Sequence, residues 1–162
     1  MTTQLLAQQC EDHMVDIGGE IRVAGQSSRG GPWRIGIEAP ASDRIGELHR
    51  VLHLTDVGLA TSGDYRNFKE VDGQRVDHVL DPRTAMPSES TVVSATVVHR
   101  NAMLADAYAT ALMVLPVNEG LRLADAQGFA VYLLWVQEQA GAGVPGIAAS
   151  YNDAMVRYLP QN

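Results

Sequence analysis

Three short segments carry residue types whose spacing could support chemistry. Residues 61–65 (TSGDY) place small side chains around a glycine, and backbone N–H groups in such a turn can hold a phosphate or a carboxylate. Residues 78–84 (HVLDPRT) place a histidine before an Asp-Pro pair, and an imidazole can act as an acid, a base or a phosphate donor near neutral pH. Asp106 and Thr110 lie four residues apart, so a helix would present both on one face.

Each segment also has a plainer structural explanation. A Ser-Gly-Asp triplet most often forms only a turn. His78 can cap a sheet edge while Asp81 orders the turn at Pro82. Asp106 can stabilise a helix N-terminus, and Thr110 can bond to the carbonyl four residues earlier. A carboxylate and a hydroxyl one turn apart are oxygen ligands of the type Mg²⁺ prefers, but two protein oxygens do not define a metal site.

The first part of the chain is predicted to be extended. Residues 14–23 have the β-branched composition of a strand, interrupted by Gly18 and Gly19, which indicate a bulge or a close backbone approach. Residues 33–40 alternate as a second strand. A polar loop joins the two, so we expect a long-looped hairpin.

The middle of the chain is predicted to contain more strands and turns. Residues 49–59 alternate like a strand, and residues 60–68 (ATSGDYRNF) are rich in turn formers. Asp72-Gly73 between two extended runs predicts a hairpin over residues 68–80.

Two helices and two buried strands are predicted after the hairpin. The first helix carries an apolar stripe that includes Leu104, Tyr108 and Leu112. The second helix closes at Gly128. The strands cover residues 91–98 and 129–136, the helices cover residues 101–115 and 119–127, and a terminal helix or strand lies around residues 151–159.

This order of elements predicts an α+β fold, a mostly antiparallel sheet with helices packed on it, in a single domain over residues 1–162. The hydrophobic content of 46% suits a packed core. The net charge of −7 argues against a nucleic-acid partner, and an acidic protein that binds a phosphorylated ligand often uses a divalent cation. We expect no signal peptide and no membrane span in this sequence.

Taken in order, the segments resemble one family. ATSGDY (60–65), DHVLDPRT (77–84), a buried strand and ADAYATAL (105–112) are similar to the SGDY…H-x-x-DP-x-TG…AD-x-x-x-T-x-L series of ApbE-type FAD:protein FMN transferases. VDIGGEIRVAG and WRIGIEAP resemble that family's GG-D/E strand and W-x-[VI]-G-I strand, and GFAVYLLW resembles the strand after its helical pair. The resemblance therefore covers nearly the whole chain and indicates the C-terminal half of such an enzyme.

The resemblance implies an enzyme that moves FMN from FAD to a threonine or serine of an acceptor protein, with Mg²⁺, and releases AMP. It also implies a role for each matching position. The metal ligands would be Asp106 and Thr110, the residue packed against FAD would be Leu80, the flavin site would be bordered by Ser62, Gly63, Asp64 and Tyr65, and the catalytic residue assisting phosphoryl transfer would be His78.

Two departures from the family pattern limit these expectations. Ala85 replaces the glycine of DP-x-TG, and a positive φ there would strain the loop. Family members are about twice as long, and their N-terminal half carries an A-K-G segment that we do not find here. We therefore expect an incomplete site in the isolated chain. The alternatives are a non-catalytic flavin- or nucleotide-binding domain and a half-enzyme that needs a partner N-terminal segment.

Overall fold

The fold centres on an antiparallel sheet. A computed structural model describes residues 10–40, 46–63, 69–71, 74–76, 79–137 and 146–160. Within these residues, six strands form the main sheet in the order β1-β2-β5-β10-β11-β12, and every neighbouring pair is antiparallel. The strands are β1 (His13–Ile17), β2 (Glu20–Ala24), β5 (Gly58–Gly63), β10 (Val92–His99), β11 (Ala130–Gln137) and β12 (Gly146–Tyr151). The α+β expectation is confirmed.

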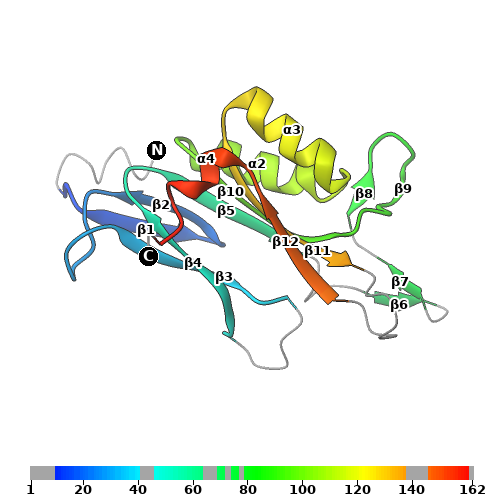
Figure 1. Ribbon diagram of the computed structural model, residues 1–162, viewed down its shortest axis with the longest axis horizontal. Coiled ribbons are helices and arrows are strands. Elements are labelled where there is room, and N and C mark those ends of the chain that lie inside the picture. Colours follow the sequence, from blue (N-terminus) through cyan, green and yellow to red (C-terminus); the bar gives the residue numbers. More distant parts are fainter. Residues whose placement is uncertain are drawn as a thin grey trace.

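Both faces of the sheet are covered, as Figure 1 shows. Helices α2 (Ala102–Leu112) and α3 (Val117–Gln127) lie on one face. The hairpin of β3 (Trp33–Glu38) and β4 (Leu48–Leu54), with the short helix α4 (Asp153–Val156), packs on the other. None of the described helices is long and apolar enough to cross a membrane.

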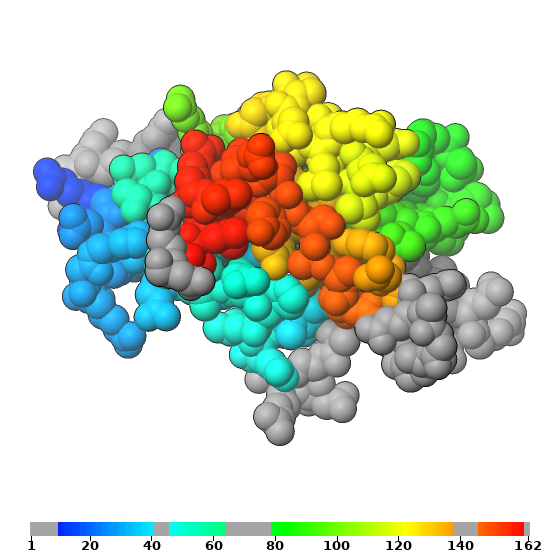
Figure 2. Space-filling model, viewed as in Figure 1, coloured from blue at the N-terminus to red at the C-terminus, as the bar shows by residue number. Residues whose placement is uncertain are grey.

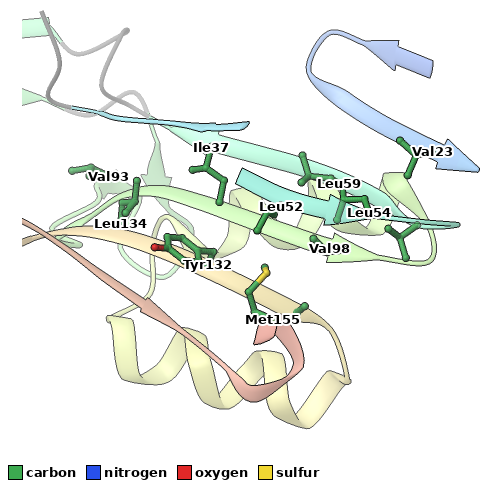
Figure 3. Close-up of a cluster of buried hydrophobic side chains, with 12 residues drawn as sticks. Val23, Ile37, Leu52, Leu54, Leu59, Val93, Val98, Tyr132, Leu134 and Met155 are labelled. Atoms are coloured by element: carbon green, nitrogen blue, oxygen red, sulfur yellow. The ribbon is translucent and has the colours of Figure 1, made fainter. Parts of the chain in front are cut away.

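The central strand β10 is buried on both sides because each face has a cover. Successive side chains point to opposite faces, so Val97 packs beneath the helices and Val98 packs beneath the β3–β4 hairpin. Figure 3 shows the hydrophobic core between the sheet and the β3–β4 hairpin, in which Leu52 and Leu54 of the hairpin face Tyr132 and Val98 of the sheet. This double burial explains why residues 91–98 read as a continuous apolar run.

Two short hairpins complete the described structure. β6 (Lys69–Val71) pairs with β7 (Gln74–Val76) on either side of Asp72-Gly73, which confirms the predicted hairpin there. β8 (Leu80–Asp81) pairs with β9 (Met86–Pro87).

The expected bulge at Gly18 and Gly19 is wrong. These residues form the two-residue turn of a tight hairpin, in which Ile17 of β1 pairs with Glu20 of β2. Both glycines have positive φ, 72° and 103°, which is the backbone such hairpin turns require. The expected pairing of residues 14–23 with residues 33–40 is also wrong, because β3 pairs with β4 instead.

The predicted apolar stripe on the first helix is wrong only at Leu104, because Leu112 is buried and Tyr108 and Leu115 pack against the same core. α2 buries Ala105, Ala109 and Leu112, whereas Leu104 is 39% exposed. The cause is a close approach of the helix to β5. A Cβ built on Gly58 would lie 2.6 Å from the Cα of Ala102, so only small side chains fit this helix–sheet interface. Hydrophobicity alone favours Leu104, and the close tertiary contact near the start of the helix selects Ala105 instead.

Candidate metal and phosphate site between β5 and α2

Two of the three segments whose residues could support chemistry meet at the end of β5. The Ser62 Oγ and the Thr110 Oγ1 lie 3.1 Å apart and are hydrogen-bonded, with either atom able to donate. Residues 60–63 therefore do not form the predicted turn but the last part of a strand. Alternation along this strand turns Gly58, Ala60 and Ser62 toward α2, which brings the Ser62 hydroxyl to the helix.

A cavity of about 210 Å³ opens at this junction. It lies below the ~300–1,000 Å³ typical of sites that enclose a drug-sized ligand. Its size and its hydroxyl groups suit a hydrated cation or a phosphate group better than a whole dinucleotide. The residues around it are Thr61, Ser62, Gly63, Val79, Thr110 and Met113.

Asp106 lies one helical turn before Thr110, half-buried, on the same face of α2. In the described part of the chain, no side chain pairs with its carboxylate, and no three His, Cys, Asp or Glu residues gather as a metal cluster. Mg²⁺ is commonly bound by one or two carboxylates together with water and substrate phosphates. Asp106 does not line the cavity itself, but its carboxylate lies one helical turn from the Thr110 hydroxyl, so the two side chains offer the oxygen ligands that such an ion prefers.

The loop of the Asp-Pro motif is held against the end of α2. Arg83 donates to both carboxylate oxygens of Asp81, the Nη2–Oδ2 distance being 2.6 Å, and these hydrogen bonds lower the pKa of Asp81. Ser88 Oγ donates to the Met113 carbonyl at 3.2 Å. Figure 2 shows this green segment beside the yellow helix α3. The contacts place Val79 at the cavity wall.

The loop contains the strain expected at Ala85. Its φ is 57°, a left-handed conformation that costs an L-residue roughly 1–2 kcal/mol. The Ala85 N–H donates to the Asp81 carbonyl at 2.8 Å, which closes the turn and holds this backbone. Ala85 therefore holds a backbone conformation that a glycine would adopt without this strain.

Ala85→Gly is expected to stabilise the chain by about 0.5–1 kcal/mol, because relief of strain exceeds the ~0.5–1 kcal/mol entropic cost of glycine. Urea unfolding measures it. The matched control is Ala126→Gly at an exposed position in α3, which should lose about 1 kcal/mol of helix stability. Equal losses at the two positions would contradict the strain argument.

The remaining predicted site residues fall into two groups. Gly63 lines the cavity, and Leu80, in β8, is 57% exposed and open to a ligand. The flavin-contact roles of these two residues stay predictions. His78, Asp64 and Tyr65 lie outside the described residues.

Gly58 was not predicted from the sequence as a position of importance, although a glycine inside a strand-like run signals a close backbone approach. No role was predicted for the histidines of β4 either. The structure gathers His49 and His53 with Arg34 and Arg50 around an open hollow of about 510 Å³ on the hairpin side. The pKa of His49 is lowered by burial and then by the charge of Arg50, and its Nε2 lies 3.1 Å from the Tyr132 hydroxyl.

The fold and the site define a class of protein. It is an antiparallel α+β domain with a hydroxyl-lined cavity and, on the adjoining helix, a carboxylate without a partner among the described residues. Comparison with known proteins identifies the family. The ApbE family model matches residues 1–133, and the chain belongs to the ApbE family. It is 43% identical over 130 residues to the FAD:protein FMN transferase of Vibrio cholerae, covering 80% of this chain and 39% of that protein. The protein of the same name from Escherichia coli K12 is 38% identical over 122 residues, covering 75% of this chain and 34% of its own.

Solved structures agree over nearly the whole chain. The apo flavinyl transferase ApbE of Pseudomonas stutzeri matches 99% of this chain and 47% of its own with a TM-score of 0.79 at 34% identity. The flavin transferase ApbE of Vibrio cholerae matches 98% and 48% with a TM-score of 0.81 at 35% identity. The chain thus spans less than half the length of these relatives and corresponds to their C-terminal part.

Proposed function

We propose that this chain is the C-terminal part of an FAD:protein FMN transferase, which moves FMN from FAD to a threonine or serine hydroxyl of an acceptor protein in a Mg²⁺-dependent reaction. The observation that carries the proposal is the junction of Ser62 with Thr110 beside Asp106. Two segments 48 residues apart, each weak by itself, meet at one cavity. The relatives' name adds the flavin chemistry.

The reaction breaks the phosphoanhydride bond of FAD and forms a phosphoester bond to the acceptor. The acceptor hydroxyl oxygen bonds to the flavin-side phosphorus of FAD, the P–O bond to the AMP-side phosphate breaks, and AMP leaves with the electron pair. The hydroxyl proton must pass to a base, and we assign this role to His78. When bound, Mg²⁺ would neutralise charge on the pyrophosphate. Asp106 and Thr110 would hold the ion, and the walls of the cavity would orient the phosphates.

A half-enzyme is the second candidate, in which this chain binds nucleotide but needs a partner N-terminal segment for turnover. It is supported by the size of the cavity at β5 and α2, which is too small to enclose FAD. It is also supported by the share of the relatives that the chain covers.

The test is release of AMP from FAD. The chain, FAD, Mg²⁺ and an acceptor protein are mixed, AMP is measured by chromatography, and covalent flavin is measured by in-gel fluorescence. A parallel reaction adds the N-terminal half of the Vibrio cholerae relative. Turnover by the chain alone supports a transferase, and turnover only with the added half supports the half-enzyme. FAD binding without turnover in either reaction would support the non-catalytic binding domain. The absence of both binding and turnover would exclude all three functions.

A further inference from the structure

The Ser62 hydroxyl makes a contact that its family position does not explain. The resemblance places Ser62 at the border of the flavin, yet its Oγ is hydrogen-bonded to the Thr110 Oγ1 at 3.1 Å. A helical threonine has a local alternative, because its hydroxyl can bond the carbonyl four residues earlier and its χ1 splits between two rotamers. At Thr110 the hydroxyl instead reaches across to β5.

We infer that Ser62 is a positioning residue, which fixes the rotamer of Thr110 and accepts a hydrogen bond from the Thr110 hydroxyl when a cation binds at Thr110 and Asp106. The inference rests on the proposed Mg²⁺ site. It changes the assignment of Ser62 from the flavin to the metal ligand.

The direction of the hydrogen bond follows from the chemistry of a hydroxyl ligand. A hydroxyl that binds a cation uses a lone pair and keeps its proton, which then needs an acceptor on another side. The Ser62 Oγ is the acceptor within reach. Without a cation either hydroxyl can donate, whereas a bound cation selects donation from Thr110 to Ser62. Such outer partners orient a ligand, and their loss typically weakens metal binding ~10–100-fold.

A second half-buried serine on the sheet has the same chemistry in a different place. The Ser150 Oγ, on the edge strand β12, accepts a hydrogen bond from the Trp135 Nε1 at 3.1 Å. Thr61, the neighbour of Ser62, does not serve as a control, because it lines the same cavity. Ser150 is therefore the matched control for Ser62.

The experiment measures the Thr110 side chain and the metal separately. In the labelled full chain, three-bond couplings to the Thr110 methyl group report its χ1 rotamer. Mn²⁺, a hard octahedral cation, is titrated in place of Mg²⁺ and followed by electron paramagnetic resonance. The variants are Ser62→Ala, Ser62→Thr and Ser150→Ala, and the melting temperature of each confirms its fold.

Ser62→Ala is expected to average the Thr110 couplings and to weaken Mn²⁺ binding by ~10–100-fold with little change in melting temperature. Ser62→Thr, which keeps the hydroxyl, restores both. Ser150→Ala lowers the melting temperature, because the half-buried Trp135 Nε1 loses its acceptor, but changes neither the couplings nor the affinity.

Thr110 couplings that stay fixed in Ser62→Ala, or an unchanged Mn²⁺ affinity, would overturn the role of Ser62. Failure of the proposed function gives a different result. If the unmodified chain bound no Mn²⁺, the metal assignment would fall, and the couplings would still support or overturn the fixing of Thr110 by Ser62.

Discussion

We expect Asp106→Ala to abolish the proposed response of the chain to Mg²⁺ while leaving its fold intact. The carboxylate is half-buried on α2, and no side chain pairs with it within the described residues, so its removal breaks no hydrogen bond or ion pair among them. Alanine also has the higher helix propensity, by ~0.5 kcal/mol. The free energy of unfolding without metal should therefore stay within about 0.5 kcal/mol of its original value.

The quantity expected to fall in Asp106→Ala is the increase in melting temperature that Mg²⁺ produces. An ion that binds only the folded chain raises the melting temperature, and this increase grows with the ratio of ion concentration to Kd. Loss of the only charged ligand on α2 should raise the Kd on the order of 100-fold or more, above the cost of an outer partner. Thermal melts over a Mg²⁺ series, with Mn²⁺ titration as a second measurement, check this expectation.

Glu89→Ala is the matched control for Asp106→Ala. Glu89 is an exposed carboxylate on the loop before β10, so its removal changes the net charge equally without touching α2. Its variant should keep the Mg²⁺-dependent rise in melting temperature. If both variants lost the Mg²⁺-dependent increase in melting temperature equally, the metal response would be an effect of net charge and not of Asp106 as a ligand. Severe unfolding of Asp106→Ala with unchanged Mn²⁺ binding would remove Asp106 from the metal site.

The sequence predicted elements where the local pattern and the tertiary environment agree. The buried strand β10, the hairpin around Asp72-Gly73 and the C-terminal end of α3 at Gly128 follow from local chemistry, and each is confirmed. Gly128 has φ 72°, the left-handed value that its role at the helix end requires. Family resemblance likewise identified Ala85 as the position of strain.

Prediction was wrong where a long-range contact decides the local structure. The partner of β3 depends on which strand edge is free, and the pattern of residues 33–40 does not contain that information. The buried face of α2 depends on how closely the helix approaches β5, and hydrophobicity favoured Leu104 over Ala105. The same contact determines the meeting of Ser62 with Thr110. The candidate residues could thus be named from the sequence, but their contact could not be derived from local pattern.

Gly58→Ala is the second change with a large expected effect, because this glycine sets the distance between β5 and α2. The added Cβ would lie 2.6 Å from the Cα and 2.7 Å from the N of Ala102. Both are backbone atoms at the start of the helix, so the helix itself must move. Overpacking of this kind costs about 1–3 kcal/mol, and each kcal/mol lowers the melting temperature of a domain this size by ~2–4 °C. Movement of α2 away from β5 also lengthens the distance from Ser62 to Thr110, so Mg²⁺ binding should weaken together with stability.

Gly120→Ala separates this backbone effect from ordinary crowding. The Cβ of that variant would meet the Leu112 Cδ2 at 2.9 Å, which is the end of a side chain that can rotate. Gly120 lies inside α3, where alanine gains about 1 kcal/mol of helix propensity. The two terms nearly cancel, so stability should stay close to the original and Mg²⁺ binding should not change. If Gly58→Ala proved as mild as Gly120→Ala, the close approach of α2 to β5 would not be what holds Thr110 at the cavity. The contact between Ser62 and Thr110 would then depend on their side chains and not on the spacing of the two elements.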